Sequence, residues 1–406
     1  MDTTLLVIAG AVYIGMLLGE IPGLALDRTG VALLGAIALV ATGRVAPTAA
    51  WDAVDVTTIA LLLGLMVVSA QFRLGGFYGA VTARLAAWEA TPQRLLAALI
   101  LLAGVLSAVL ANDIVCLAMA PVLAAGCARR GLDPVPFLLA LAAAANVGSA
   151  ATLIGNPQNM LVGQALRLSF AGYLLDAFVP AALGLGAVWL VVAVAYRGRW
   201  SRPTVVPELA PPALNRWQTA KGTLVLGALV AVFLLGHWPR ETLALIAAGV
   251  LLTSREMASR DILAEVDWHL LVLFAGLFIV NHALLESGAV GAALQGLRGA
   301  GVDLAQPAWL FGSAAVLSNL VSNVPAVMLL LPAARPPLGG PVLALASTLA
   351  GNLLIVGSIA NIIVVDQAAR LGVRISWRTH ALVGVPVTVL TLAIAAGWLW
   401  LKSAAN

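Results

Sequence analysis

The stretch NVGSAATLIGNPQNMLVG, residues 146–163, interrupts an otherwise apolar chain with polar and helix-breaking residues. It holds three asparagines, a glutamine, a serine, a threonine, three glycines and a proline. Proline and glycine break regular helices, and the freed backbone groups then need hydrogen-bonding partners elsewhere. The stretch therefore predicts a non-helical segment enclosed by protein, and the sequence around it indicates what kind of protein encloses it.

The surrounding chain has the composition of a membrane protein. Of its 406 residues, 62% are hydrophobic and only 10% are charged, and the mean hydropathy is +1.02. Soluble domains carry about 25% charged residues. Apolar runs of about 15 to 25 residues recur from end to end, which is long enough for helices to cross a bilayer core. The alternating pattern of a membrane barrel is absent, so we predict an all-α polytopic membrane protein.

The basic charge of the chain does not indicate a nucleic-acid partner. The net charge is +4, but the 22 Lys and Arg are spread over the whole chain without a patch of basic and aromatic residues. An intramembrane enzyme would need a nucleophile with a base, or a set of metal ligands, and four scattered histidines supply neither. We therefore expect no enzyme and no nucleic-acid binding.

The chain contains an internal repeat, since three segments of its first half align with three of its second half. At offsets of 212, 211 and 202, the pairs are VDVTTIALLLGLMVVSAQFRLGGFYGAVTARL with VDWHLLVLFAGLFIVNHALLESGAVGAALQGL, SAVLANDIVCLAMAP with SNLVSNVPAVMLLLP, and IGNPQNMLV with VGSIANIIV. Such regular offsets indicate duplication. We predict a first repeat at 5–196 and a second at 220–401, joined by a polar linker at 197–219.

Each half is expected to cross the membrane five times, once through a helix broken at GNPQN or GSIAN, and to carry one hairpin, at 95–128 or 307–334. An odd number of crossings starts the second half on the opposite side of the membrane, so the repeats are inverted. With a cytoplasmic linker, sixteen of the 22 Lys and Arg fall inside and six outside, in agreement with the positive-inside rule. We expect a multi-pass protein of the plasma (inner) membrane with extracytoplasmic termini.

Inverted repeats with interrupted helices are typical of secondary transporters. Broken helix is tolerated in a membrane only where it is buried in protein or lines a cavity. The four polar breaks, Asn112-Asp113, GNPQN, SNVP and GSIAN, are therefore expected to meet near the midplane. Helix N-termini there suit an anion, and carbonyl and amide oxygens suit Na⁺.

The paired motifs SAVLANDIVCLAMAP and NVGSAATLIGNPQN, with SNLVSNVPAVMLLLP and GNLLIVGSIAN, resemble the ion transporter superfamily. That group includes the ArsB arsenite pumps, NhaD-type sodium/proton antiporters, the melanocyte P protein and divalent anion/sodium symporters. ANDIVCLAMAP and the ISW at 375–377 are most similar to the ArsB and P-protein branches. The dicarboxylate symporters carry Ser-Asn-Thr at both hairpin tips, whereas this chain has Ala-Asn-Asp and Ser-Asn-Val, which argues against dicarboxylate transport.

The resemblance implies two re-entrant helical hairpins whose tips, Asn112 and Asn323, face the broken-helix loops at 155–159 and 357–361. It also implies elevator-type alternating access and a homodimer. The candidate substrate- and ion-binding residues are Asn112, Asp113, Thr152, Gly155, Asn156, Asn159, Ser322, Asn323, Gly357, Ser358 and Asn361. Candidate Na⁺ ligands among them are Asn112, Asn159, Asn323 and Asn361.

Asp113 is the most specific of these candidates, because a carboxylate inside a bilayer is costly and usually functional. Val324 holds the equivalent position, so only one half carries the acid. Binding of a coupling ion or proton is one interpretation, and capping of the second hairpin helix is the other. His282 and Glu286, one turn apart, form either a snorkelling pair or a proton relay.

The paired motifs contain no Lys or Arg, which limits the charge of the substrate. A small neutral oxyacid such as arsenite, or a cation-coupled monoanion, fits better than a polyanion. We therefore predict an H⁺- or Na⁺-coupled secondary transporter of a small anion or arsenite-like oxyacid, with no cofactor beyond the coupling ion. A Na⁺/H⁺ antiporter of the NhaD type is the alternative.

Overall fold

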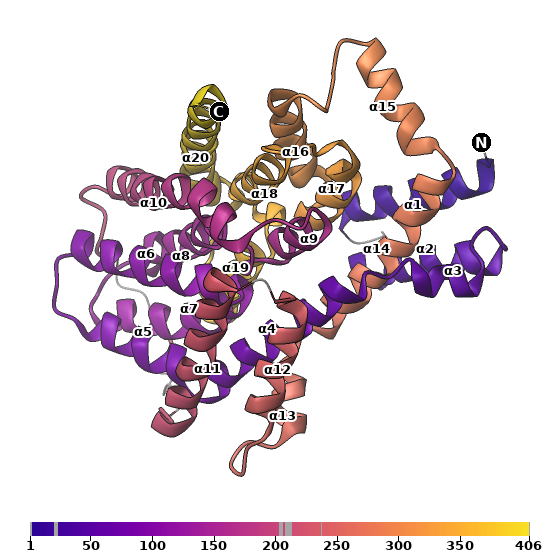
Figure 1. The fold of residues 1–406 in the computed structure, drawn as a ribbon. Coiled ribbons are helices and arrows are strands. Elements are labelled where there is room, and N and C mark those ends of the chain that lie inside the picture. Colours follow the sequence, from indigo (N-terminus) through magenta and orange to yellow (C-terminus); the bar gives the residue numbers. More distant parts are fainter. Residues whose placement is uncertain (1, 20–22, 203–205, 208–212, 237, 406) are drawn as a thin grey trace.

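A computed structural model describes residues 2–19, 23–202, 206–207, 213–236 and 238–405 of the protein. The regular elements of this part of the chain are α-helices and short 3₁₀ turns (Figure 1), and Leu132 forms an isolated β-bridge with Ser201. The predicted linker, 197–219, lies partly outside the described residues. The all-α polytopic fold class is confirmed.

The described residues form two successive sets of ten α-helices. The first set is α1 (Thr3–Leu18), α2 (Arg28–Ala41), α3 (Pro47–Asp52), α4 (Val56–Leu74), α5 (Phe77–Ala87), α6 (Pro92–Val109), α7 (Asn112–Arg129), α8 (Pro134–Ser149), α9 (Pro157–Ala165) and α10 (Phe170–Ala195). The second set is α11 (Arg216–Leu235), α12 (Arg240–Leu252), α13 (Ser259–Ala264), α14 (Trp268–Glu286), α15 (Ala289–Gly299), α16 (Pro307–Val321), α17 (Asn323–Leu330), α18 (Gly339–Ala350), α19 (Ile359–Arg370) and α20 (Trp377–Ala405).

Residues that align in sequence have the same structural role in the two sets. Asp55 accepts from the amide of Thr57 and caps α4, and Asp267 accepts from that of Leu270 and caps α14. Gly76 precedes α5 with a φ of 71°, and Gly288 precedes α15 with a φ of 75°. Left-handed backbone of this kind favours glycine, which explains why glycine occurs at both positions.

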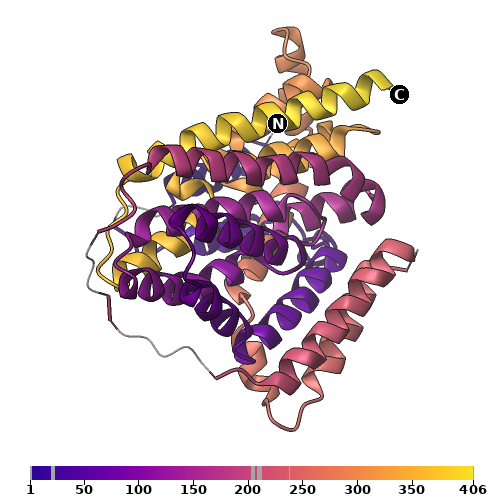
Figure 2. The same ribbon diagram turned by 90° about the vertical axis from the view of Figure 1, so that its left-hand side faces the viewer.

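The halves interlock reciprocally: α2 packs against α14, and α12 against α4. Gly64 of α4 allows this approach, because a Cβ there would lie 2.6 Å from the carbonyl carbon of Ala244. Gly276, its equivalent in α14, faces Ala32 of α2, with the corresponding distance 2.8 Å. Exchange of equivalent contacts is the pattern that a twofold axis produces. In Figure 2, α10 and α20 lie side by side, and they also pack together.

Seven described helices are long and apolar enough to cross a membrane: α4, α6, α7, α10, α11, α14 and α20. The predicted hairpins are α6–α7, with its turn at Leu110 and Ala111, and α16–α17, with its turn at Ser322. The predicted broken helices are α8–α9 and α18–α19.

The second half begins four residues earlier than the predicted residue 220, because Asn215 caps α11 by accepting from the amide of Gln218. The short helices α3 and α13, in equivalent loops, were not anticipated from the apolar pattern.

Candidate functional site

Backbone amides of the first hairpin tip donate hydrogen bonds to the first broken helix and to α4. The amide of Asn112 donates to the carbonyl oxygen of Gly155 over 3.3 Å, and the amide of Ala111 donates to Ser69 Oγ of α4 over 3.2 Å. Because Leu110 is extended, α6 ends before the tip and leaves its last backbone groups available for such partners. The non-helical tip is therefore enclosed by protein, as the sequence predicted.

The break between α8 and α9 follows from its own residues. Pro157 is the first residue of α9, and the extended Asn156 caps that helix by accepting from the amide of Asn159 over 2.9 Å. At Gly155 a Cβ would lie 2.4 Å from the carbonyl oxygen of Ser149 and 2.6 Å from that of Ser107. Only glycine allows the chain to pass so close to both elements.

Equivalent amides close the two breaks. Asn159 Nδ2 donates to the carbonyl oxygen of Thr152 over 2.9 Å and to that of Ser149 over 3.4 Å. In the second half, Asn361 Nδ2 donates to the carbonyl oxygens of Leu354 and Gly351, over 3.0 and 2.8 Å. These are the same positions shifted by 202 residues, so both asparagines satisfy backbone that broken helix leaves unpaired.

Two further side chains cross between the halves. Thr348 Oγ1 of α18 accepts from Asn156 Nδ2 (3.3 Å) and donates to Asn159 Oδ1 (3.2 Å). Asn146 of α8, which aligns with Thr348, accepts from Ser358 Oγ (2.8 Å) and donates to Asn361 Oδ1 (3.2 Å). The first half-helix of each broken helix is thus hydrogen-bonded to the second half-helix of the other: α18 to α9, and α8 to α19.

Both hairpin tips enter this network. Asn112 Nδ2 donates to Asn146 Oδ1 over 3.3 Å. With its amide oriented to satisfy its neighbours, Asn323 Nδ2 donates to the carbonyl oxygens of Ser347 and Gly357 (3.1 and 3.2 Å), and its Oδ1 accepts from Gln158 (3.3 Å). All four polar breaks therefore meet at the junction of the two repeats.

A few buried polar atoms of this network have no partner among the described residues: Ser107 Oγ, Asn112 Oδ1, Ser318 Oγ, Asn319 Oδ1 and Asn352 Nδ2. Ser107 and Ser318 are equivalent residues, and each lies five residues before the asparagine of its hairpin tip. Unsatisfied buried oxygens are uncommon in folded proteins. They are the atoms of this junction that remain available to a bound solute or ion.

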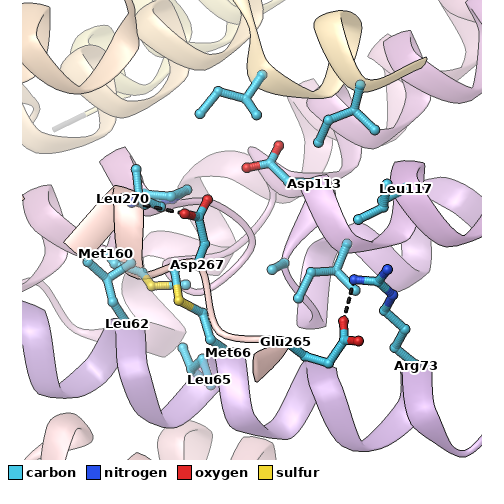
Figure 3. A pocket seen from close by; sticks show the side chains of 15 residues that line it. Leu62, Leu65, Met66, Arg73, Asp113, Leu117, Met160, Glu265, Asp267 and Leu270 are labelled. Atoms are coloured by element: carbon cyan, nitrogen blue, oxygen red, sulfur yellow. Dashed lines mark hydrogen bonds and ion pairs between the residues drawn. The ribbon is translucent and has the colours of Figure 1, made fainter. Parts of the chain in front are cut away.

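Asp113 lies beside the network, in a cavity of about 190 Å³ between α4, α7 and the start of α14. In Figure 3 its carboxyl group faces the same space as that of Asp267, while Glu265 forms an ion pair with Arg73 at one side. The N-terminal residues of both second half-helices, Pro157 and Ile359, also line the cavity. The cavity therefore connects the polar junction with three carboxylates, Asp113, Glu265 and Asp267, which are called the acidic wall below.

The acidic wall belongs to one side only. The positions in the other half that align with Asp113, Glu265 and Arg73 are Val324, Ala53 and Leu285. Asp267 does have an acidic equivalent, Asp55, whose carboxylate accepts from the hydroxyl of Thr58 over 2.7 Å. The duplicated scaffold thus carries a site that is symmetric in its amides and asymmetric in its charges.

The structure brings most of the predicted site residues together. The network contains Asn112, Thr152, Gly155, Asn156, Asn159, Asn323, Gly357, Ser358 and Asn361. Asp113 lines the adjoining cavity, and Ser322 forms the second tip with a φ of 75° and no side-chain cap. The N-cap of α7 is Ala111, which makes no side-chain cap hydrogen bond, and Asp113 lies in the first turn, where an acidic group complements the helix N-terminus. The binding roles of these residues stay predictions.

His282 and Glu286 lie away from the site. Their side chains approach to 3.5 Å, and that of Glu286 is 70% exposed. His282 follows Asp267 by fifteen residues, which along a helix corresponds to about 22 Å. The pair is therefore at the opposite end of α14 from the cavity, which favours the snorkelling interpretation.

The sequence interpretation missed Asn146, Gln158, Thr348 and Asn352 as members of the network. Asn146 stood inside the quoted stretch, but it precedes the GNPQN break and was not named as a candidate. Extending the 202-residue alignment by eight positions toward the N-terminus would have paired it with Thr348. Polar residues at matching positions of two otherwise apolar helices were the available signal.

Comparison with known proteins agrees with a transport fold. Residues 5–340 match the family model CitMHS, described as Citrate transporter. The transporter MT2759 of Mycobacterium tuberculosis is 32% identical over 384 residues, 86% of this chain and 87% of that protein. The silicon efflux transporter LSI3 of Oryza sativa subsp. japonica is 28% identical, covering 92% of this chain and 93% of its own length.

The crystal structure of the Alcanivorax borkumensis YdaH transporter shares the fold, with a TM-score of 0.61 and 14% identity over 99% of this chain and 97% of that one. The chain is a multi-pass membrane transporter, not an enzyme. It belongs to the CitMHS citrate transporter family, within the superfamily that its motifs resemble. Its placement nearest the ArsB and P-protein branches stays a prediction.

Proposed function

We propose that this protein is a secondary active transporter that couples H⁺ or Na⁺ to the movement of a small, uncharged or singly charged oxyacid by alternating access. The observation that carries the proposal is the junction of two broken helices and two hairpin tips, which adjoins a cavity with an acidic wall. Such a junction offers amide and hydroxyl groups to a solute and carboxylate to a cation.

The charges of the cavity argue against a polyanionic substrate, even though the family model carries the name of citrate. Three carboxylates line it, Asp113, Glu265 and Asp267, against one guanidinium, that of Arg73. Arg73 is already paired with Glu265. A trianion beside the remaining carboxylates would be strongly repelled at the reduced dielectric constant of a membrane protein.

A neutral polyhydroxide fits these groups better. Amides and hydroxyls can both donate to and accept from its hydroxyl groups. Dissolved silicon, the cargo in the name of the rice relative, is chiefly an uncharged tetrahydroxide, and arsenite is an uncharged trihydroxide. Both are small enough for a cavity of about 190 Å³. We therefore propose that substrates of this protein are of this chemical class.

Asp113 is the proposed site of coupling. Loading of a proton or Na⁺ would neutralise its carboxylate before the site moves through the low-dielectric part of the membrane. Asn112 Oδ1, on the preceding residue, is buried with no hydrogen-bond partner among the described residues and would supply an oxygen ligand to Na⁺. Asn159 and Asn361 are weaker Na⁺ ligands, because their Oδ1 atoms already accept from Thr348 and Asn146.

The proposed transport cycle uses the inverted repeats. With the linker cytoplasmic, as the distribution of Lys and Arg favours, Arg73 and Glu265 would lie on the cytoplasmic side of the cavity. If each repeat adopted the conformation that the other now has, the site would open to the opposite side of the membrane. This exchange is how inverted repeats produce alternating access. Movement of the hairpins and broken helices as one unit, in a homodimer, is the elevator form of this proposal.

A Na⁺/H⁺ antiporter is the second candidate, and the acidic wall of the cavity is the observation that favours it. In that case Asp113 and Asp267 would bind only cations, which compete for the same carboxylates. No solute would be needed for exchange.

Purified protein in proteoliposomes separates the two candidates. Silicic acid, arsenite and citrate are each offered under an imposed pH or Na⁺ gradient, and solute and proton fluxes are recorded together. The proposal expects gradient-driven movement of silicic acid or arsenite and not of citrate. Na⁺/H⁺ exchange that proceeds at the same rate without any solute would instead establish the antiporter.

A further inference from the structure

A second cavity, of about 520 Å³, lies between the end of α10, the first residues of the linker and the start of α20. Four of its lining residues are arginines, Arg199, Arg202, Arg374 and Arg378, and one is acidic, Asp133. None of them belongs to the transport site. Figure 2 shows that the linker leaves α10 at the end where α20 begins. The cavity is therefore lined by arginines from the linker, Arg199 and Arg202, and from the second half, Arg374 and Arg378.

The wall that carries Arg199 and Arg202 is fixed by several contacts. The amide of Asp133 donates to the carbonyl oxygen of Trp200 over 2.8 Å, and Leu132 forms a β-bridge with Ser201. The indole of Trp200 is buried, with its ring centroid 5.8 Å from that of Phe137. This part of the linker is thus anchored to the start of α8, and its arginines project from a defined backbone.

Arg199 is held in place without neutralisation of its charge. Its guanidinium lies over the ring of Tyr196, 5.6 Å from the centroid, and donates to the carbonyl oxygen of Ala195 at the end of α10. Neither partner carries an opposite charge. A guanidinium has five donors, so Arg199 retains donors for an anion.

The opposite wall concentrates positive charge at an unfavourable place. Arg374 and Arg378 are exposed, four residues apart, and Arg378 lies in the first turn of α20. Both arginines line the same cavity, so their like charges repel, and the N-terminal end of the α20 dipole disfavours the cation of Arg378. Within the described ranges, no salt bridge pairs Arg199, Arg374 or Arg378 with a carboxylate.

Asp133 does not balance this charge. Its carboxylate caps α8 by accepting from the amide of Val135 over 3.0 Å, and its residue is 8% exposed. A single capping carboxylate opposite Arg199, Arg374 and Arg378 leaves an excess of positive charge. A phosphate group would supply the missing anion and accept bidentate hydrogen bonds from arginine.

We propose that this cavity binds the phosphate headgroup of an anionic phospholipid. Leu382, which lines the cavity, and the nearby Trp377 are 48% and 56% exposed, so apolar surface adjoins the arginines on the outside of α20. An acyl chain can lie along that surface while the phosphate enters the cavity. Basic pockets at the cytoplasmic ends of membrane helices bind anionic headgroups in this way, and the distribution of Lys and Arg favours the cytoplasm for this end.

The bound lipid clamps the linker of one half to the first turn of α20 in the other. It is expected to stabilise the folded protein and is separate from the transported solute.

The test compares Arg374→Gln/Arg378→Gln with Arg255→Gln/Arg260→Gln, which removes the same charge from an exposed loop of the second half outside the cavity. Each full-length protein is placed in phosphatidylcholine nanodiscs with increasing phosphatidylglycerol, and the Tm is recorded. The wild type and the loop variant should gain Tm as phosphatidylglycerol increases. The cavity variant should need a phosphatidylglycerol content higher by roughly fivefold for each arginine lost, on the order of 25-fold for both.

Two further arms secure the interpretation. Arg374→Lys/Arg378→Lys keeps the charge but loses the fork geometry, so it should respond between the wild type and the glutamine variant; it also replaces that variant if the latter is unstable in phosphatidylcholine alone. Equal responses of the cavity and loop variants would overturn the proposal. A Tm gain from inorganic phosphate in detergent that matches the gain from lipid would overturn the assignment to phospholipid.

Discussion

Asn146 and Thr348 hold equivalent positions in the two halves, and each hydrogen-bonds the broken helix of the other half. Asn146 bonds Ser358 and Asn361, and Thr348 bonds the residues that align with them, Asn156 and Asn159. A twofold relation between the repeats thus extends to single hydrogen bonds at the centre of the molecule. If α9 moves, it must either break its hydrogen bonds to α18 or carry α18 with it, and the same holds for α19 and α8.

Truncation of Asn146 is expected to be more damaging than truncation of Thr348. Asn146→Ala leaves Asn112, Asn352, Asn361 and Ser358 without one partner each, whereas Thr348→Val removes bonds to three side chains. Unsatisfied buried polar groups cost about 1–3 kcal/mol each. We expect a loss of roughly 2–4 kcal/mol for Asn146→Ala and less for Thr348→Val, measured by thermal unfolding in detergent.

Ser347→Ala is the matched control, because Ser347 Oγ is buried beside Thr348 but donates only to the carbonyl oxygen of Ala344 in its own helix. It should retain nearly the full stability of the wild type. If Ser347→Ala and Asn146→Ala lower the Tm equally, the hydrogen bonds between the repeats contribute no more to stability than the bond of Ser347 within its own helix.

Much of this site could be predicted from the sequence. Polar residues that recur at fixed offsets in an apolar chain, such as Asn112 with Asn323 and Asn159 with Asn361, have few explanations other than a common polar junction. Duplication then supplies long-range information, because a pairing seen in one half implies its equivalent in the other. The all-α polytopic class followed from the composition and the apolar runs, and the inverted repeats followed from the duplication.

The acidic wall could not be predicted in the same way. Glu265 and Asp267 come from the loop before α14, and Arg73 from the end of α4, and none of the three lies in a polar break. Their meeting with Asp113 depends on how α4 and α14 pack across the repeats. An isolated charge near the end of an apolar span is normally a membrane-surface residue, so the sequence alone did not distinguish these from the others.

Replacement of Asp113 should uncouple transport from the ion gradient. In Asp113→Asn the side chain keeps its size but can no longer change charge, so solute movement should stop responding to an imposed pH or Na⁺ gradient while solute-driven counterflow persists. Proteoliposome uptake with and without the gradient measures this. Asp366→Asn is the control, since Asp366 is a half-exposed partner of Arg370 on the surface of α19. Wild-type gradient dependence in Asp113→Asn would show that the coupling group is elsewhere.

Loss of Glu265 should reduce the affinity for the coupling cation. Glu265→Gln leaves the Arg73 guanidinium without its ionic partner at the edge of the cavity that contains Asp113. The added positive charge opposes cation entry, so half-maximal transport should require several-fold more Na⁺ or a lower pH, with little change in maximal rate. At an effective dielectric constant of about 20, charges several Å apart still interact by a few kcal/mol.

The double variant Arg73→Gln/Glu265→Gln tests the cause, because it removes both charges and should recover most of the cation affinity. Persistence of the defect in the double variant would mean that Glu265 itself binds the cation.

The reciprocal helix crossings should be sensitive to the smallest added side chain. In Gly64→Ala the new Cβ would lie 2.6 Å from the carbonyl carbon of Ala244, and in Gly276→Ala the nearest atom, the carbonyl carbon of Ala32, is at 2.8 Å. Because backbone is in the way, α4 and α12, or α14 and α2, must separate, and overpacking of this kind costs about 1–3 kcal/mol.

The control for this crossing is Gly291→Ala in α15, where an added Cβ meets no atom within 4 Å. An exposed helical glycine replaced by alanine should gain roughly 0.5–1 kcal/mol, so its Tm should rise while those of Gly64→Ala and Gly276→Ala fall. Ala244→Gly in the Gly64→Ala background removes only a methyl group and leaves the carbonyl carbon and oxygen within 2.7 Å of the new Cβ. It should therefore fail to restore the Tm, whereas full rescue would show that the contact at this crossing is between side chains rather than backbones.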